Sequence, residues 1–405
     1  MTTKPFMRIS LVRVLLLLSL AFAAEYGIIL ERVSSLGINY GQVGNNLPPP
    51  EKVIDLLTSL RITKTRIYDT NPQILKAFAN SKIEIVVTIE NQILPLLTDP
   101  QQALRWVSSR IKPYFPATKI TGIMVGNELF TDQDSSLIGY LVPAMINIHR
   151  ALVQLSLDKY IQVSTPSSLA VLAESYPPSS GSFRPEVAAV MQQLLRFLDS
   201  TKSPFWINAY PYFAYKDNPT KIPVDYVLFN RNPGMTDPNT RLHYDNMLYA
   251  QVDAVNFAVM KMGYRNVEVR VSETGWPSKG DVEETGAWPT NAAVYNRNLM
   301  MRQFGGEGTP LRHNTRLEVY IFALFNEDMK PGPTSERNYG LFRPDGSMSY
   351  NLGFSSMSTI AASESFSLPS SSASKAMKKE KKSLECCTIL ILAMIIIQVV
   401  LPRRS

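Results

Sequence analysis

Cysteine is nearly absent from this 405-residue chain, which contains two, Cys386 and Cys387, both near the carboxyl end. The main body therefore has no thiol, and no disulfide can hold it together in an oxidising compartment. Acceptors for N-glycosylation are also missing, because the one similar triplet has Pro219 directly after Asn218. We expect hydrophobic packing to stabilise the fold.

Histidine is almost as scarce, and several familiar motifs are missing. His149, His243 and His313 lie far apart without ligand spacing, so we expect each to be structural and not a metal ligand. The glycine-rich run 305–308 lacks the Lys-Ser/Thr of a phosphate loop, and the chain has no Gly-x-Ser-x-Gly elbow of a serine hydrolase. We expect neither a metal nor a cofactor.

The formal net charge of +7 is concentrated at the two ends of the chain. Lys4, Arg8 and Arg13 contribute three positive charges, and the segment 375–405 holds seven basic and two acidic residues. Without these ends the central body has a net charge near −1. Because nucleic-acid binding needs a basic surface, we expect no nucleic-acid partner.

The amino-terminal segment 1–24 has the pattern of a signal peptide. Two basic residues precede an apolar stretch, 14–20, and Ala21-Phe-Ala23 supplies small residues for cleavage. The alternative is a membrane anchor, but the stretch is short for a span and Arg13 interrupts it. We expect the chain to be exported.

The carboxyl-terminal segment predicts attachment to a membrane. A Ser-rich stalk, 356–374, is followed by a basic spacer, 375–385, and a 16-residue apolar run that ends at Leu401. This order resembles a glycosylphosphatidylinositol signal, although the spacer is unusually basic and the chain ends Pro402-Arg-Arg-Ser405. The alternative is a retained transmembrane anchor. Either places the body at the cell wall and the extracellular face of the plasma membrane.

Between these ends, strand-like runs alternate with helical patterns. Most are separated by helices such as the one opened by Pro50 and the one ending at Gly263. Such alternation favours parallel βα units, and eight of them favour a single (β/α)₈ TIM barrel over residues 25–355. The eight runs are 36–41, 64–69, 84–90, 120–128, 161–168, 204–212, 267–273 and 317–326. The Pro-, Asn- and Asp-rich stretch 212–246 shows little helical period and predicts an excursion on the rim.

Two of these strands end in glutamate. Glu128 closes the fourth run, and Glu273 closes the seventh. Barrel enzymes work at the carboxyl ends of their strands, and two carboxyl groups about 5 to 5.5 Å apart suit retaining glycoside hydrolysis. The amide of Asn127 is placed to bind the sugar hydroxyl next to the anomeric carbon. The alternative, for either acid alone, is a solvated or ion-paired strand end.

Aromatic residues gather near the expected strand ends, where flat rings can stack on the apolar faces of sugars. For Tyr40 and Tyr210 we expect a place in the cleft, since each neighbours an Asn in a polar turn, whereas Phe325 is expected in the core. The full set is Tyr40, Tyr68, Tyr210, Tyr212, Phe213, Trp276, Phe325 and Phe342.

Several longer segments carry a resemblance to a known family. They are Leu36-Gly-Ile-Asn-Tyr-Gly-Gln-Val43, Gly44-Asn-Asn-Leu-Pro48, Arg66-Ile-Tyr-Asp69, Val125-Gly-Asn-Glu128, Ser164-Thr-Pro166, Asn208-Ala-Tyr-Pro-Tyr-Phe213, Ser272-Glu-Thr-Gly-Trp-Pro-Ser278, Phe322-Ala-Leu-Phe-Asn-Glu327, Lys330-Pro-Gly-Pro333 and Glu336-Arg-Asn-Tyr-Gly-Leu-Phe342. On these segments the chain resembles the plant β-1,3-glucanases of glycoside hydrolase family 17, from Leu36 to about Gly353.

The resemblance implies a monomeric enzyme that cleaves β-1,3-glucans such as callose internally and with retention. It implies that Glu128 is the general acid/base and Glu273 the nucleophile, with Glu327, Lys330 and Glu336 supporting them. Trp276 lies within one of the matching segments and is included among the substrate-binding residues. Two alternatives use the same barrel: a non-hydrolytic glucan-binding protein and a transglycosylase.

Overall fold

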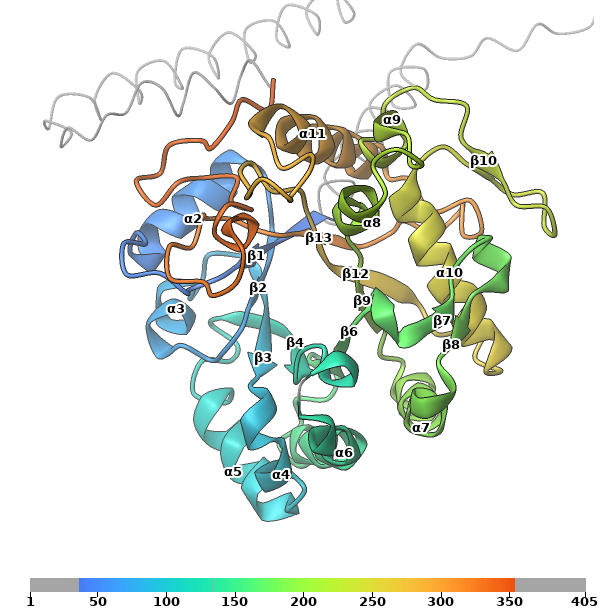
Figure 1. Ribbon diagram of the computed structural model, residues 1–405. Helices are drawn as coiled ribbons and strands as arrows, with labels where there is room; N and C mark the ends of the chain where they lie inside the picture. The colour runs from blue at the N-terminus through green and yellow to red at the C-terminus, as the bar shows by residue number, and fades with distance from the viewer. Residues whose placement is uncertain (1–35, 133, 354–405) are drawn as a thin grey trace, which may run out of the picture. The chain divides into compact units, whose positions relative to one another are not determined.

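Short segments rich in β-branched residues form the strands of a parallel barrel in the computed structural model, which describes residues 36–132 and 134–353. Figure 1 looks into this barrel, with helices around its outside. Its strands are β1 Leu36–Tyr40, β2 Lys64–Ile67, β3 Glu84–Ile89, β4 Lys119–Val125, β5 Gln162–Ser164, β6 Pro166–Ser168, β9 Phe205–Asn208, β12 Val269–Thr274 and β13 Val319–Ile321.

The strand order shows how the barrel closes. It runs β5-β4-β3-β2-β1-β13-β12-β9-β6, and every pairing is parallel. Only Thr165 separates β5, which pairs with β4, from β6, which pairs with β9. These two segments are therefore one interrupted fifth strand, and the expected (β/α)₈ barrel is confirmed.

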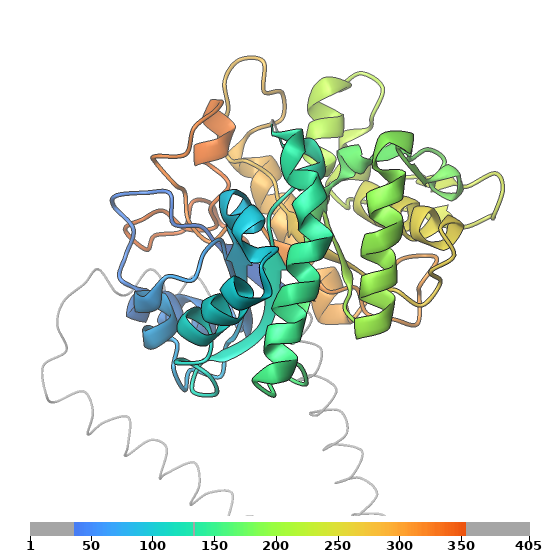
Figure 2. The ribbon, with the colours of Figure 1, turned by 90° about the horizontal axis from the view of Figure 1, so that it is seen from below.

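Proline begins many of the surrounding helices, because its fixed φ suits the first turn and its missing N–H costs no helical hydrogen bond there. Figure 2 shows α6 and α7 side by side on the outside of the barrel. The helices are α2 Pro50–Ser59, α3 Pro72–Ala77, α4 Leu94–Leu97, α5 Pro100–Arg110, α6 Ile138–Gln154, α7 Pro185–Thr201, α8 Pro211–Asp217, α9 Val224–Val227, α10 Met247–Lys261 and α11 Pro289–Gly305. The helices expected at Pro50 and before Gly263 correspond to α2 and α10.

The inside of the barrel contains an apolar layer and, nearer the carboxyl ends of the strands, a polar one. Val86, Met124, Trp206 and Tyr320 form a buried cluster between the strands. Gly37 makes room for this cluster, since a Cβ there would lie 2.5 Å from the Tyr320 ring. Farther along the strands the buried residues are polar, which leaves room for chemistry at the carboxyl ends; they include Asn39, Arg66, Thr88, Asn208, Ser272 and Glu273.

The structure differs from the expected elements on the rim. The sixth strand ends at Asn208 and not at residue 212, because Pro211 starts α8. The excursion 212–246 also contains α9 and a hairpin of β10 Met235–Thr236 with β11 His243–Tyr244. These elements are too short to show a period in the sequence. A second hairpin, β7 Leu172–Glu174 with β8 Ser182–Phe183, follows the fifth strand. The expected signal peptide, stalk and tail lie outside the described residues.

Candidate active site

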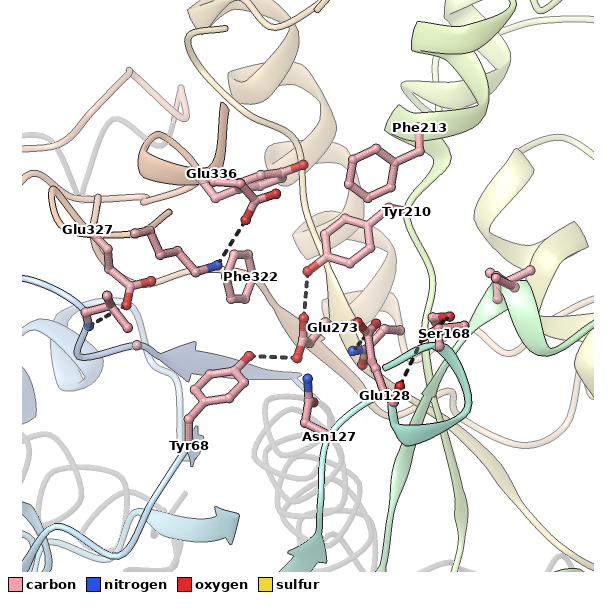
Figure 3. Close-up of a pocket in the computed structure, with 18 of the residues that line it drawn as sticks. Tyr68, Asn127, Glu128, Ser168, Tyr210, Phe213, Glu273, Phe322, Glu327 and Glu336 are labelled. Atoms are coloured by element: carbon pink, nitrogen blue, oxygen red, sulfur yellow. Dashed lines mark hydrogen bonds and ion pairs between the residues drawn. The ribbon is translucent and has the colours of Figure 1, made fainter. Parts of the chain in front are cut away.

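A cavity of about 880 Å³ opens at the carboxyl ends of the strands. It brings together residues from β6, β9 and β12 and from the loops that follow β1, β2, β4 and β13, as Figure 3 shows in part. Of the residues expected in the site, the cavity is lined by Asn127, Glu128, Tyr210, Glu273, Glu327, Lys330 and Glu336. The two glutamates therefore share one cleft.

Glu273, on β12, is a buried carboxylate held by three donors. Its Oε1 accepts hydrogen bonds from Arg66 Nη1 and from the Tyr68 hydroxyl, both at 2.8 Å, and its Oε2 accepts one from the Tyr210 hydroxyl at 2.9 Å. Burial and the Glu273 charge raise the pKa of both tyrosines well above the ordinary value, so their hydroxyls keep their protons and donate. Figure 3 shows Tyr68 and Tyr210 reaching Glu273 from different sides. The carboxylate is fixed in orientation and its charge is stabilised.

Arg66 organises this region although the sequence analysis did not select it. Its side chain is almost fully buried, and its Nη2 donates to Asn127 Oδ1 at 2.7 Å while its Nη1 is paired with Glu273. The guanidinium also lies 4.5 Å from the centre of the Tyr68 ring. A signal was present: in Arg66-Ile-Tyr68 the period of two places both side chains on one face of β2.

Glu128 lies in a tight turn just beyond β4. Gly126 has φ +74, where a Cβ would lie 2.5 Å from the Leu129 side chain, and Glu128 itself has φ 53. The left-handed conformation is unusual for a residue with a side chain, and such strain is often found at functional sites. The turn directs the carboxyl group into the cleft, as Figure 3 shows.

The surroundings of Glu128 favour its protonated form. Burial and the charge of Glu273 raise its pKa to about 7, against the opposing effects of the Asn208 hydrogen bond and Arg66. The amide of Asn208 donates to Glu128 Oε1 at 2.8 Å, and Asn208 in turn accepts a hydrogen bond from the Ser272 hydroxyl. Asn208 was not selected from the sequence, although it ends β9 beside Glu273 of β12. One cleft thus holds two carboxyl groups in different hydrogen-bonding surroundings.

Asn127 is fixed on both sides. Its side-chain oxygen accepts from Arg66, and its backbone N–H and C=O both bond to the side chain of Asn91, at 2.7 and 3.0 Å. Because the oxygen faces Arg66, the amide nitrogen points toward Glu273, as Figure 3 shows. It is placed to donate a hydrogen bond to a bound sugar hydroxyl.

Glu327, Lys330 and Glu336 form a group on the opposite wall. Lys330 Nζ lies 3.2 Å from Glu336 Oε2 and 4.2 Å from the centre of the Phe322 ring. Glu327 accepts the backbone N–H of Val43 at 2.8 Å, and burial raises the pKa of its carboxyl group. These residues surround the Glu273 side of the cleft with a cation and two further carboxyl groups.

The aromatic predictions divide into two groups. Tyr210 lines the cavity, together with Tyr68, Phe213, Phe322 and Tyr339. Phe325 is buried in the core as expected.

Tyr40 and Trp276 differ from the expectation, because both are core residues outside the cavity wall. Asn39 points into the barrel, where its amide bonds to Ser272 O at 3.0 Å, so its neighbour Tyr40 turns outward and packs against Phe325. The Trp276 indole is enclosed by Tyr212 and other rings, and its N–H donates to Gly286 O at 2.8 Å.

Known proteins of similar sequence point to one family. Residues 36–354 match the model of the family described as glycosyl hydrolases family 17. The chain is 51% identical over 323 residues to glucan endo-1,3-beta-glucosidase 11 of Arabidopsis thaliana, which covers 79% of this chain and 76% of that protein. It is 51% identical over 344 residues to glucan endo-1,3-beta-glucosidase 14 of the same plant, covering 84% and 86%.

Solved structures extend the likeness to three dimensions. CJP38, a beta-1,3-glucanase and allergen of Cryptomeria japonica pollen, superposes with a TM-score of 0.76 at 41% identity, over 80% of this chain and 99% of that one. A plant beta-glucan endohydrolase superposes with a TM-score of 0.72 at 39% identity, over 78% and 100%. Sequence, fold and cleft together place this chain in one family: it belongs to glycosyl hydrolases family 17.

Proposed function

We propose that this protein hydrolyses β-1,3-glucans, cutting within the chain and retaining the anomeric configuration. The observation that carries the proposal is the contrast between two carboxyl groups in one cleft. Glu273 is held by three donors that stabilise its charge, while burial and that same charge raise the pKa of Glu128 to about 7. The β-1,3 linkage is suggested by the activities in the names of the relatives.

In the proposed first step, Glu273 attacks the anomeric carbon while Glu128 gives its proton to the leaving oxygen, which yields a covalent glycosyl-enzyme. In the second step Glu128 takes a proton from water, and the water oxygen displaces Glu273 from the sugar. Asn127 would bind the sugar hydroxyl beside the reacting carbon, and Tyr210 would hold Glu273 in line for attack.

Two further depressions adjoin the cleft, which supports internal cleavage of a long chain. On one side Asp69 is shared with a depression bordered by Glu90 and Arg110. On the other side Ala214 and Gln251 are shared with an apolar cavity. We expect a bound polysaccharide to reach past the reacting centre toward both depressions.

The proposal is tested by measuring reducing ends released from a soluble β-1,3-glucan by the wild type and by Glu273→Gln. We expect the substitution to reduce release by at least about 10³-fold while the midpoint of thermal unfolding stays close to that of the wild type. Unchanged turnover would remove Glu273 from the mechanism. Binding without turnover by the wild type would indicate a glucan-binding protein, and products longer than the substrate would indicate a transglycosylase.

The linkage is tested separately with linear β-1,3-, β-1,4- and mixed-linkage glucans. We expect release from the β-1,3 polymer and little from the β-1,4 polymer. Faster cleavage of the β-1,4 polymer would overturn the proposed substrate.

The proposal includes an extracellular, membrane-tethered location, supported by the apolar amino-terminal and carboxyl-terminal segments of the sequence. We expect phosphatidylinositol-specific phospholipase C to release the protein from plasma membranes. Retention in the membrane after this treatment would favour a transmembrane anchor.

A further inference from the structure

An apolar cavity of about 490 Å³ lies beside the catalytic cleft. Ala214 of α8 and Gln251 of α10 line both spaces, so the two cavities adjoin each other there. The far walls of this second cavity, which we term the distal cavity, come from the excursion on the rim and from the loop after β7. They include Tyr176, Pro178, Ile222, Tyr226, Met235 and Met247.

The walls of the distal cavity are tied together by a buried carboxylate. Asp237, which follows β10, accepts hydrogen bonds from the backbone N–H and the hydroxyl of Ser179, both at 2.9 Å. Asn239 donates to the same hydroxyl at 2.9 Å. The loop that carries Tyr176 and Pro178 is thereby fastened to the hairpin that carries Met235. Hydrogen bonds therefore hold the segments that line the distal cavity in fixed positions.

The distal cavity lies on the leaving-group side of the cleft. In Figure 3, Glu128 and Ser168 lie on one side of Glu273 and Tyr68 on the other. Because the acid protonates the leaving oxygen, the departing part of the substrate extends past Glu128. From Ser168, at the end of β6, the chain continues through β7 to Tyr176, which lines the distal cavity.

The lining suits the apolar faces of sugar rings together with one polar anchor. Tyr176 is 75% exposed and free to stack, and Tyr226 is half-buried. The Oε1 atom of Gln251, at the junction of the two spaces, is buried and has no hydrogen-bond partner. A carbonyl oxygen in this state is costly unless a ligand supplies a donor, and a sugar hydroxyl would do so.

From these observations we infer that the distal cavity binds the leaving-group end of the glucan, several sugar units beyond the bond that is cut. Tyr176 stacks on a sugar ring, and Gln251 accepts a hydroxyl hydrogen bond at the entrance. Binding energy gained at this remote position accelerates the cleavage of long chains more than that of short ones. This inference rests on the proposed glucan hydrolysis and adds a chain-length preference to it.

The experiment compares kcat/KM for the β-1,3-linked trisaccharide and heptasaccharide in the wild type, Tyr176→Ala and Tyr160→Ala. Tyr160 is a matched control, because it is 60% exposed but borders a different cavity, with Lys64 and Arg270. We expect Tyr176→Ala to lower the ratio of heptasaccharide to trisaccharide kcat/KM about three- to tenfold, since one aromatic contact is lost. Tyr160→Ala is expected to keep the wild-type ratio.

Binding provides a second measurement that does not require turnover. In the Glu273→Gln background, we expect calorimetry to show weaker heptasaccharide binding after Tyr176→Ala. An unchanged kcat/KM ratio and unchanged heptasaccharide affinity would overturn the inference while leaving the proposed hydrolysis intact. Failure of the wild type to cut any β-1,3-glucan would instead overturn the proposed function.

Discussion

Glu128 and Glu273 are chemically identical side chains whose surroundings prepare them for different tasks. Glu273 accepts three hydrogen bonds, one of them from a guanidinium, whereas Glu128 has one amide donor and faces the charge of Glu273. Repulsion between two carboxylates is relieved when one keeps its proton, and Glu128, which has fewer donors to stabilise a charge, is the one placed to keep it. The neighbouring residues therefore determine which of the two glutamates acts as the acid and which as the nucleophile.

The fall of kcat/KM on the alkaline side of the pH profile should follow the loss of the proton from Glu128. Because its pKa is raised to about 7, the acid form dominates below that pH, and kcat/KM should fall as the pH rises through about 7. The Asn208 hydrogen bond lowers this pKa, so Asn208→Leu should move the alkaline limb upward by about one pH unit. Profiles of kcat/KM against pH measure the shift. A limb that stays in place or moves down would contradict the assignment.

Arg66 should be needed both for activity and for stability. Arg66→Met leaves the buried carboxylate of Glu273 without its cation, and breaking such a pair costs about 3 to 5 kcal/mol of unfolding free energy. We expect kcat to fall at least about 10²-fold, because Asn127 also loses its partner. Urea unfolding and initial rates measure the two effects. Arg150→Met, on the exposed surface of α6, serves as control.

For single residues, the sequence predicts which side chains reach the site better than it predicts which partners surround them. Both glutamates could be found because each follows an apolar run, yet nothing in a single strand indicates that Arg66 and Asn208 hold them across the barrel. Tyr40 lies in the core and not in the cleft, because strand alternation turns it outward when its neighbour Asn39 points into the barrel. Trp276 also lies in the core, because rings from other elements, such as that of Tyr212, enclose it.

At the scale of elements, the loop after β12 holds the segment that carries Glu336. This segment is the 3-10 helix η6, Thr334–Arg337. Asp281 accepts the backbone N–H of Thr334 at 2.9 Å as well as its hydroxyl, and buried Glu284 does the same for Ser335 at 3.0 Å. The loop following the Glu273 strand thus fixes the opposite wall of the cleft.

Weakening the contact between Glu284 and Ser335 should reduce catalysis without removing any group that lines the cleft. Glu284→Gln replaces a charged acceptor with an amide, and we expect kcat/KM to fall about tenfold as Glu336 and Lys330 lose their position. Exposed Glu283→Gln, one residue earlier, is the matched control. Equal activity of the two variants would show that the contact does not position the cleft.

Helices and strands whose apolar residues repeat at regular spacing could be predicted from the sequence, whereas very short elements could not. The helix after Pro50 has four apolar residues at helical spacing, whereas α9 has four residues in all and no measurable period. The fifth strand was expected to be continuous. Its division at Thr165 arises because one half pairs with β4 and the other with β9, which is a property of barrel closure.

At the scale of the whole molecule, a disulfide-free body depends on packing and on buried polar contacts that link distant parts of the chain. Asp253 of α10 is one of these, since it is fully buried and accepts the N–H of Leu311 at 2.9 Å and the amide of Asn256 at 3.1 Å. It joins α10 to the segment that enters β13. Burial raises its pKa to about 6.

The pH dependence of stability should reveal this group. A raised pKa means that the folded chain holds the proton more tightly than the unfolded chain, so the stabilisation is present below about pH 4 and is lost as the pH rises to about 6. We expect Asp253→Asn to remove about 3 kcal/mol of this change in unfolding free energy. Urea unfolding from pH 4 to 7 measures it, with exposed Asp199→Asn as control. An unchanged pH profile in Asp253→Asn would contradict the prediction.

We expect Glu273 to form the covalent bond to the sugar while Glu128 transfers protons in the same cleft. A 2-deoxy-2-fluoro β-1,3-glucosyl fluoride should form the glycosyl-enzyme quickly and release it slowly, so that mass spectrometry of peptide digests can locate the label. We expect one label per chain, on Glu273, and no label in Glu273→Gln. A label on Glu128, Glu327 or Glu336 would contradict it.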